Sequence, residues 1–393
     1  MGSMFKRIII IVLDGVGVGA LPDAATYGDR DAATLQHVAM TVGGLRLPNL
    51  ERLGLGRIAP IQGVRVLADP RGCWGKMAER SPGKDSVTGH WELAGIVLDQ
   101  PFATYPEGFP EEIISAFIVA TGLRPLGNVA ASGTDILRQL GEEHLKTGRP
   151  IVYTSSDSVF QIAAHEEIIP REELYAICRK TEKILQPYNV CRVIARPFSG
   201  AGAADFFRTN GRHDFSLKPP RPNLLQLLSE HGVETFGVGK IHDLYAGAGL
   251  NDFLLSSGNR DGMAKMLTVL SHVESGLIMT NLVDFDMLYG HRLDARGFAG
   301  ALEEFDAWLP RLIETLRQDD LLIVTADHGC DPTTPGTDHT REYIPLLVTT
   351  KKGLDGVDLG TRKSFADVGA SVAENFRLHL EHGQSFLSSL LLN

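Results

Sequence analysis

The sequence is poor in cysteine and contains no long apolar segment. Its four cysteines, Cys73, Cys178, Cys191 and Cys330, are scattered and form no Cys-x-x-Cys pair, so the usual signatures of a disulfide framework and of a thiolate zinc site are missing. The strongest apolar run near the N-terminus, Ile8 to Leu13, is far shorter than the roughly 20 residues of a membrane-spanning helix, and no signal-peptide cleavage pattern follows it. The sequence therefore predicts a cytoplasmic protein with no membrane partner.

Positive charge is also scarce. The chain of 393 residues has 38 Lys and Arg against 48 Asp and Glu, which gives a formal net charge of −10. A nucleic-acid-binding protein needs a broad basic face, so we expect no nucleic-acid partner, whereas a few local arginines can bind a small phosphate. Hydrophobic residues make up 43% of the chain, and its length predicts one large domain with a smaller one.

Short β-branched runs alternate with amphipathic segments along the chain. The expected strands are Arg7–Leu13, Ile151–Thr154, Cys191–Ala195, Glu234–Val238, Leu277–Leu282, Leu321–Thr325 and Leu346–Thr349. Helical periodicity is clear between several of them, for example in Arg171–Leu185, Asn223–His231 and Ala299–Arg317. This alternation predicts an α/β fold with a largely parallel sheet.

The residues with chemical potential fall into two groups, separated by a segment that has strands and helices of its own. Turn-rich joints flank this segment at Asp99–Pro101 and at Lys218–Pro222, where successive prolines prevent a helix from continuing. We expect a discontinuous catalytic core of residues 4–100 and 221–393, with an inserted cap domain of residues 101–220.

Two expected strands end in residues that can bind a metal. Asp14 ends the first strand and is followed by Gly15-Val-Gly-Val-Gly19, which resembles a dinucleotide-binding loop only weakly, because that fingerprint places its acid about 20 residues later. Asp327 and His328 follow the strand Leu321–Thr325. Side chains at the carboxyl ends of strands face the ligand crevice of an open α/β sheet.

A third strand end and a later histidine extend this set. Asp286 and His291 follow the strand Leu277–Leu282, and His339 lies eleven residues after His328. A single histidine or aspartate is often only a hydrogen-bonded or turn-forming group, but their joint occurrence at three strand ends favours metal binding. Mixed carboxylates and imidazoles suit a divalent ion such as Mn²⁺ or Zn²⁺, and six ligands suffice for the two ions that phosphoryl transfer can use.

The segment Lys84-Asp-Ser-Val-Thr-Gly-His-Trp-Glu92 supplies hydroxyl groups where a helix is expected to begin. A helix N-terminus presents free N–H groups to a phosphate, so Ser86 or Thr88 can carry a phosphoryl group. The alternative is that either residue is an ordinary helix cap.

Together these motifs resemble the bacterial phosphopentomutases of the alkaline-phosphatase superfamily. The resemblance rests on Asp14-Gly-Val-Gly-Val-Gly, Asp85-Ser-Val-Thr-Gly-His-Trp-Glu, Asp284-Phe-Asp-Met-Leu-Tyr-Gly-His, Ala326-Asp-His-Gly-Cys-Asp and Thr337-Asp-His-Thr-Arg-Glu. It extends through the middle segment, in Tyr153-Thr-Ser-Ser-Asp-Ser-Val-Phe-Gln-Ile-Ala-Ala-His, Ala195-Arg-Pro-Phe and Asn210-Gly-Arg-His-Asp-Phe. It implies an alkaline-phosphatase-like core with a largely parallel central sheet flanked by helices, and a smaller inserted α/β cap domain.

The resemblance also implies roles for individual residues. One Mn²⁺ ion would be held by Asp286, His291 and His339, and a second by Asp14, Asp327 and His328. Thr88 would carry the phosphoryl group after loading by glucose 1,6-bisphosphate or ribose 1,5-bisphosphate. Substrate contacts would fall to Ser155, Asp157, Arg196, Arg208 and Lys240. The implied reaction interconverts the 1- and 5-phosphates of ribose or 2-deoxyribose, and the sequence is compatible with a monomer.

Three alternatives remain at this point: a cofactor-independent phosphoglycerate mutase, a metal-dependent phosphatase and a catalytically silent metal-binding protein. The first normally uses serine and a shorter step than the five residues from Asp286 to His291. The inserted segment with its arginines favours a mutase over a phosphatase, because a mutase must exclude water. We expect a mobile cap in which Arg196 and Arg208 bind the substrate's distal phosphate through their planar forks.

Overall fold

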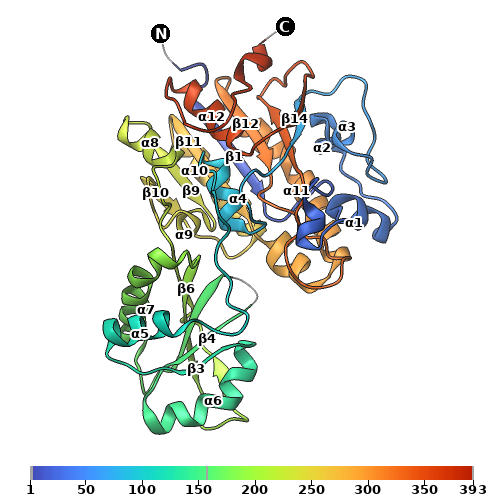
Figure 1. Ribbon diagram of the computed structural model, residues 1–393. Helices are drawn as coiled ribbons and strands as arrows, with labels where there is room; N and C mark the ends of the chain where they lie inside the picture. The colour runs from blue at the N-terminus through green and yellow to red at the C-terminus, as the bar shows by residue number, and fades with distance from the viewer. Residues whose placement is uncertain (1–2, 156–157, 392–393) are drawn as a thin grey trace. The chain divides into compact units, whose positions relative to one another are not determined.

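The computed structural model describes residues 3–155 and 158–391. The chain divides into two compact units, each with its own sheet (Figure 1). Unit 1 consists of Met1–Gln100 and Pro219–Asn393, and unit 2 of Pro101–Lys218.

An eight-stranded sheet forms the centre of unit 1. In spatial order its strands are β10 (Asp252–Leu254), β9 (Thr235–Val238), β11 (Gly276–Leu282), β1 (Arg7–Leu13), β12 (Asp320–Thr325), β13 (Ile344–Thr349), β2 (Cys73–Met77) and β14 (Asp358–Arg362). Strand β13 is antiparallel to both of its neighbours, while the other pairs are parallel. The predicted α/β class with a largely parallel sheet is therefore confirmed.

Every residue of β1, β11 and β12 is buried, which shows that both faces of this sheet are covered. Helices provide this cover, as is usual for a largely parallel sheet. One group of contacting helices comprises α1 (Thr34–Val42), α2 (Pro48–Leu53), α3 (Leu55–Ile58), α10 (Asn259–His272) and α11 (Ala295–Thr315). A second group comprises α4 (Ser86–Leu93), α8 (Leu224–Glu230), α9 (Ile241–Leu244) and α12 (Ala366–Asn375).

Unit 2 is a smaller α/β unit. Its sheet has the order β3 (Leu126–Ala130), β4 (Ile151–Thr154), β5 (Val159–His165), β6 (Arg192–Ser199) and β7 (Phe207–Arg208), and β8 (His213–Ser216) also pairs with β6. Its helices are α5 (Glu111–Thr121), α6 (Gly133–Thr147) and α7 (Arg171–Leu185).

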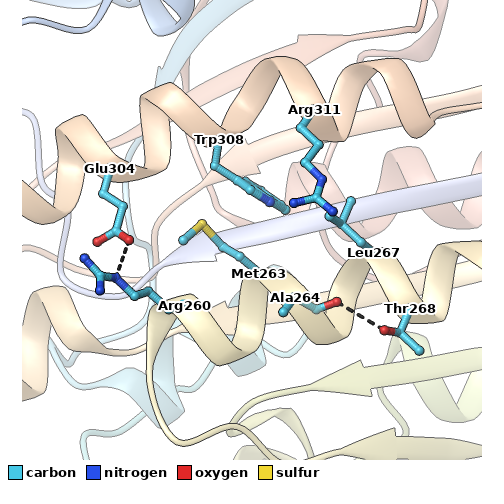
Figure 2. A pocket seen from close by; sticks show the side chains of 8 residues that line it. All are labelled: Arg260, Met263, Ala264, Leu267, Thr268, Glu304, Trp308 and Arg311. Carbon is cyan, nitrogen blue, oxygen red and sulfur yellow. Dashed lines mark hydrogen bonds and ion pairs between the residues drawn. The ribbon is translucent and has the colours of Figure 1, made fainter.

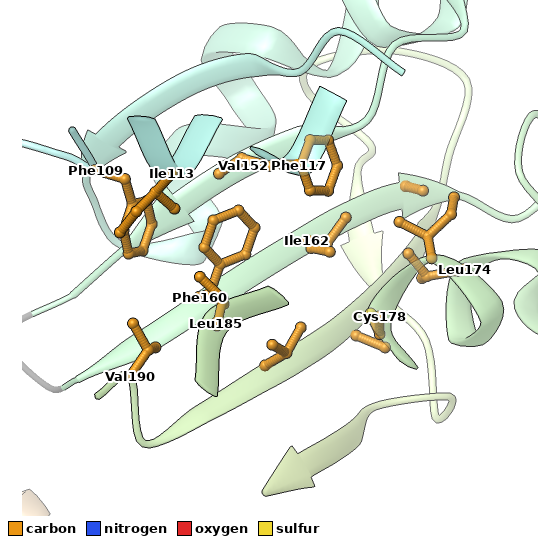
Figure 3. Close-up of a cluster of buried hydrophobic side chains, with 14 of the residues drawn as sticks. Phe109, Ile113, Phe117, Val152, Phe160, Ile162, Leu174, Cys178, Leu185 and Val190 are labelled. Atoms are coloured by element: carbon orange, nitrogen blue, oxygen red, sulfur yellow. The ribbon is translucent and has the colours of Figure 1, made fainter. Parts of the chain in front are cut away.

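The core of unit 2 is divided between the two faces of its sheet. Alternate residues of a strand point to opposite faces, so Val152 joins one hydrophobic cluster while Tyr153 joins another. The first cluster is built around Phe160, whose ring stacks on Phe117 and meets Phe109 in a tilted arrangement (Figure 3).

The expected elements agree with the structure in position. Helix α7 and strands β1 and β4 have the expected bounds, and the remaining expected segments overlap β6, β9, β11, β12, β13, α8 and α11. Among the described residues, no helix is both long enough and apolar enough to cross a membrane. The four cysteines are free and buried.

Candidate metal centre

Three neighbouring strands of unit 1 deliver carboxylates to one edge of the sheet. Strands β11, β1 and β12 are adjacent and parallel, so their carboxyl ends lie together. Asp14 follows β1 directly, and Asp327 and His328 come just after β12. Asp286 lies in a single π-helical turn, η3 (Phe285–Tyr289), that follows β11. Such turns often occur at functional sites.

A short antiparallel bridge brings His339 to the same edge. Gly329 N donates to Thr340 O at 3.1 Å, and Thr340 N donates to Gly329 O at 2.7 Å. The ring centroids of His328 and His339 are consequently 4.1 Å apart. The ring of His291 lies 4.8 Å from that of His339.

The structure brings all six predicted ligands into one connected cluster: Asp14, Asp286, His291, Asp327, His328 and His339. Asp286 Oδ2 is 3.2 Å from His291 Nε2, and its Oδ1 is 3.4 Å from His339 Nε2. His328 Nε2 is 3.3 Å from Asp14 Oδ1 and 3.5 Å from Asp327 Oδ2. The coordinating atoms of Asp14, Asp327 and His328 lie within 4.8 Å of one another, as do those of Asp286, His328 and His339.

Opposing electrostatic effects act within this cluster. Burial acts to raise the pKa of Asp286, but His339 and His291 hold it well below its usual value. Burial likewise acts to raise the pKa of Asp14, but the hydrogen bond from His328 and the positive charges of His328 and Lys240 together outweigh it, and the pKa is lowered. Burial acts to lower the pKa of His291, whereas the contact with Asp286 raises it to about 9. The site therefore favours ionised carboxylates beside positive charge, which a divalent cation can supply in place of the imidazole protons.

Two buried carboxylate oxygens show that the cluster fits a metal. Asp286 Oδ1 and Asp327 Oδ2 are inaccessible to solvent and have no hydrogen bond of good geometry among the described residues; the near groups are ring nitrogens, such as His339 Nε2 at 3.4 Å from Asp286 Oδ1 and His90 Nδ1 at 3.0 Å from Asp327 Oδ2. A buried polar atom is costly when it is unpaired. Carboxylates and imidazoles in one small set are the donors that Mn²⁺ and Zn²⁺ accept, so the ligand chemistry and the poorly hydrogen-bonded oxygens both fit a metal.

The glycines after Asp14 serve close packing. Gly15 has φ +79°, and a Cβ there would lie 2.8 Å from Cys330 Cβ. A Cβ at Gly17 would lie 2.4 Å from the carboxylate of Glu342. The glycine run that superficially resembles a dinucleotide-binding loop thus allows the loop after β1 to pack against the loops after β12.

Two side chains outside the predicted set hold the carboxylates in place. Asn281 Nδ2 donates to Asp14 Oδ2 at 2.9 Å and lies 3.4 Å from His90 Nε2. His90 Nδ1 lies 2.8 Å from Ser86 O and 3.0 Å from Asp327 Oδ2. Asn281 and His90 are both fully buried. The sequence offered a signal for Asn281 only, since it lies near the end of an expected strand; its place beside Asp14 comes from the structure.

The two candidate hydroxyls at the start of α4 have different surroundings. Ser86 Oγ lies 3.0 Å from His328 Nε2 and 3.5 Å from Asp14 Oδ1. Thr88 Oγ1 instead donates to Asp85 Oδ2 at 2.5 Å, and its side chain packs against Gly83. The carboxylate of Asp85 also accepts from the backbone N–H groups of Val87 and Thr88, which makes Asp85 the N-cap of the helix.

The predicted substrate residues belong to both units. Ser155, Arg196 and Arg208 lie in unit 2, where Arg196 Nε donates to Gln161 Oε1 at 3.0 Å. Asp157 lies outside the described residues. Lys240 follows β9 in unit 1, and its charge contributes to the lowered pKa of Asp14.

The arginines of unit 2 gather around Tyr153. Burial acts to raise the pKa of Tyr153, against the opposing effect of Arg196, Arg208 and Arg212. Burial, with Arg212 and Arg208 nearby, lowers the pKa of Arg196 to about 10. A Cβ at Gly133 would come within 1.7 Å of Arg208 Nη2, so the guanidinium lies against the first turn of α6. Such a concentration of positive charge suits an anionic ligand.

An open groove in unit 1 is separate from the metal ligands. It has a volume of about 470 Å³ and lies between α10 and α11, where Met263 and Leu267 face Trp308 (Figure 2). At one end Arg260 forms an ion pair with Glu304. None of the six candidate ligands lines this groove.

Comparison with known proteins shows relatives along nearly the whole chain. A model of the metalloenzyme superfamily matches residues 6–380. The chain is 60% identical over 387 residues to a phosphopentomutase from Syntrophotalea carbinolica, covering 98% of this chain and 99% of that protein. It is 56% identical over 388 residues to a phosphopentomutase from Desulfitobacterium hafniense, covering 98% of this chain and all of that protein.

A solved structure of phosphoglycerate mutase from Leishmania mexicana has a similar fold, with a TM-score of 0.50, 14% sequence identity and coverage of 97% of both chains. At this identity the likeness concerns the fold alone. It agrees with the alkaline-phosphatase-like architecture that the sequence predicted.

Proposed function

This chain belongs to the phosphopentomutase family of the metalloenzyme superfamily, and we propose that it interconverts ribose 1-phosphate or 2-deoxyribose 1-phosphate with the corresponding 5-phosphate. Members of this family are isomerases that move a phosphoryl group. The observation that carries the proposal is the buried cluster of carboxylates and imidazoles at the carboxyl ends of β11, β1 and β12, in a chain more than half identical to these enzymes.

Metal dependence follows from the superfamily and from the cluster. We propose two Mn²⁺ ions, one held by Asp286, His291 and His339 and the other by Asp14, Asp327 and His328. When bound, two such ions supply positive charge that favours the alkoxide of a nearby hydroxyl and neutralises phosphoryl oxygens. The close pairing of Asp286 with His291 and of Asp14 with His328 supports this division.

A hydroxyl at the start of α4 is the proposed phosphoryl carrier. The sequence predicted Thr88, and that assignment stays a prediction. In the structure the Thr88 hydroxyl donates to the cap residue Asp85 in the first turn of α4, while Ser86 Oγ lies 3.0 Å from the imidazole of His328, itself a proposed metal ligand. We propose Thr88 as the carrier, with Ser86 as the alternative. Glucose 1,6-bisphosphate or ribose 1,5-bisphosphate would load it, transferring one phosphoryl group to the hydroxyl and leaving a sugar monophosphate.

Unit 2 is the proposed substrate-orienting cap. The proposed contacts of the pentose phosphate are Arg196, Arg208, Ser155, Asp157 and Lys240. Of these, Asp157 lies outside the described residues, and Lys240 belongs to unit 1. The positive charge gathered around Tyr153 supports a phosphate ligand for the two arginines. The cytoplasmic location and the monomeric state expected from the sequence remain predictions.

One set of assays tests this function. Chelator-treated protein should not isomerise ribose 5-phosphate, and Mn²⁺ should restore turnover more fully than Mg²⁺, because imidazole ligands suit Mn²⁺ better than the harder ion. Turnover of 3-phosphoglycerate would indicate the phosphoglycerate mutase alternative, and release of inorganic phosphate without isomerisation would indicate a phosphatase.

Phosphosite mapping identifies the carrier. After incubation with glucose 1,6-bisphosphate, we expect one phosphate on the peptide that contains Ser86 and Thr88, located on Thr88. Thr88→Ala should bind Mn²⁺ but neither become labelled nor isomerise. Labelling of Ser86, with normal activity in Thr88→Ala, would assign the carrier to Ser86 instead.

A further inference from the structure

Arg341 is a buried cation two residues after His339, and its side chain is only 3% exposed. It does not contact a candidate metal ligand through any hydrogen bond of the described residues. Its guanidinium instead faces the segment that leads into α4. Buried arginine is unusual unless its donors are fully used, which makes its set of partners informative.

One side of the guanidinium binds the segment before the carrier hydroxyl. Nη1 donates to the backbone carbonyls of Ser81 at 2.8 Å and Gly83 at 2.5 Å, and to Glu79 Oε2 at 2.6 Å. Nη2 donates to Glu79 O at 3.0 Å. Gly83 is three residues before Ser86, so these bonds fix the backbone from which α4 starts.

The other side binds the loop that follows β1 and Asp14. Nη2 donates to Asp23 Oδ2 at 3.0 Å and Nε to Asp23 Oδ1 at 3.3 Å. The backbone N–H of Arg341 donates to Asp29 Oδ2 at 2.9 Å, and its carbonyl accepts from Leu21 N at 3.0 Å. Arg341 thus joins three segments: the loop after Asp14, the segment before α4 and the loop that carries His339.

Lys84 reinforces the same connection. Its Nζ lies 3.1 Å from Asp29 Oδ2 and 3.2 Å from Asp338 Oδ2, next to His339. The start of α4 is therefore tied to the loop of His339 by two cations, of which Arg341 is the more buried. Of these two cations, only arginine has a planar group with five N–H donors, which can bind carbonyl and carboxylate oxygens on two sides at once.

We propose that Arg341 is a positioning residue, which sets the distance between the carrier hydroxyl at the start of α4 and the ligand cluster at the edge of the sheet. This inference rests on the proposed function. Phosphoryl transfer needs the reacting oxygen within a few tenths of an ångström of its productive position, and a displacement of about 1 Å can lower a rate about 100-fold. Lysine offers a single ammonium that cannot reach both sides at once, so Arg341→Lys keeps the charge but loses the connection.

The experiment compares Arg341→Lys with a matched control, Arg7→Lys. Arg7 is also fully buried, forms a bidentate ion pair with Asp320 and donates to the carbonyls of Leu270 and Val273. It lies at the start of β1, the opposite end of the strand from Asp14. Loss of stability alone should affect both variants, but only Arg341 contacts the carrier segment.

For Arg341→Lys we expect two bound Mn²⁺ ions by elemental analysis, a kcat for ribose 5-phosphate reduced about 10- to 100-fold, and a KM changed less than about threefold. The rate of phosphate transfer from glucose 1,6-bisphosphate to the enzyme should fall by the same factor as kcat. Arg7→Lys should melt at a lower temperature but retain kcat and the labelling rate. A fall in Arg341→Lys no larger than in Arg7→Lys, or a raised KM with unchanged kcat, would overturn the inference.

A second variant keeps the test decisive if Arg341→Lys does not fold. Asp23, whose side chain is 47% exposed, can be changed to Asn with little risk to the core, and this removes the charged anchor on one side. We expect slower labelling in Asp23→Asn with an unchanged melting temperature, and a wild-type labelling rate would refute the inference. If wild-type protein itself neither isomerises nor becomes labelled, the proposed function fails instead.

Discussion

Asn281 provides the most direct test of how the metal ligands are held. Its amide is fully buried and donates to Asp14 Oδ2 at 2.9 Å, and it faces His90 Nε2 at 3.4 Å. Asn281→Leu keeps the approximate size of the side chain and removes the donor. Asp14 then loses the group that orients one of its two carboxylate oxygens.

The expected effect follows from the charge of the partner. A hydrogen bond to a charged group contributes about 1.5–3 kcal/mol, and about 1.4 kcal/mol corresponds to a factor of ten in an equilibrium constant. Mn²⁺ should therefore bind Asn281→Leu about 10- to 100-fold more weakly, in the range usual for groups that orient metal ligands. The site of Asp14, Asp327 and His328 should weaken, while that of Asp286 should change little.

Electron paramagnetic resonance of free Mn²⁺ during titration of chelator-treated protein measures this directly. The matched control is Asn375→Leu, because Asn375 is also buried but does not contact the candidate metal ligands. Its side chain makes two hydrogen bonds: it accepts from Phe5 N at 2.8 Å and donates to Phe5 O at 2.9 Å. This control should lower the free energy of unfolding without changing the Mn²⁺ affinity. Binding to Asn281→Leu within about twofold of wild type would contradict the reasoning, since the orienting bond would then contribute less than about 0.5 kcal/mol.

Two further predictions concern unit 2. Phe160→Ala removes a fully buried ring whose centroid lies 4.5 Å from that of Phe109 and 5.7 Å from that of Phe117. It should lower the free energy of unfolding by about 3–5 kcal/mol in a denaturant titration. The control Phe207→Ala changes a side chain that is 59% exposed, so it should change this free energy by less than about 0.5 kcal/mol. Arg208→Lys should reduce isomerisation of ribose 5-phosphate more than hydrolysis of p-nitrophenyl phosphate, because lysine cannot replace the bidentate fork; an equal loss of both activities would argue against a substrate-orienting role.

The parts of the fold that the sequence predicted well are its buried strands and its amphipathic helices. Strand β1 reads as an unbroken apolar run because it is buried on both faces, and α7 alternates with helical period because one side packs on its sheet. Strand β5 was not expected, although all seven of its residues are buried. Its polar Gln161 and His165 interrupt the apolar pattern, and its pairing with β6 is a long-range contact.

The carrier hydroxyl shows where local reasoning stops. Ser86 and Thr88 both lie in the first turn of α4, and both fit a helix start equally well. Successive residues of a helix are rotated by about 100°, so two residues apart they point in nearly opposite directions. Which of the two hydroxyls faces His328 depends on how α4 is oriented against the sheet, and residues far away in the chain decide this.

The sequence by itself determined which side chains were available at the strand ends. Asp14, Asp286 and Asp327 follow apolar runs that the sequence pattern alone marks as strands, so their place at or just after a carboxyl end could be predicted locally. Only the tertiary structure decided that β11, β1 and β12 are adjacent, that His339 folds back beside His328, and that Asn281 supports Asp14. Strand order and loop packing arise from contacts between residues up to about 300 positions apart in the chain, and no local pattern encodes such contacts.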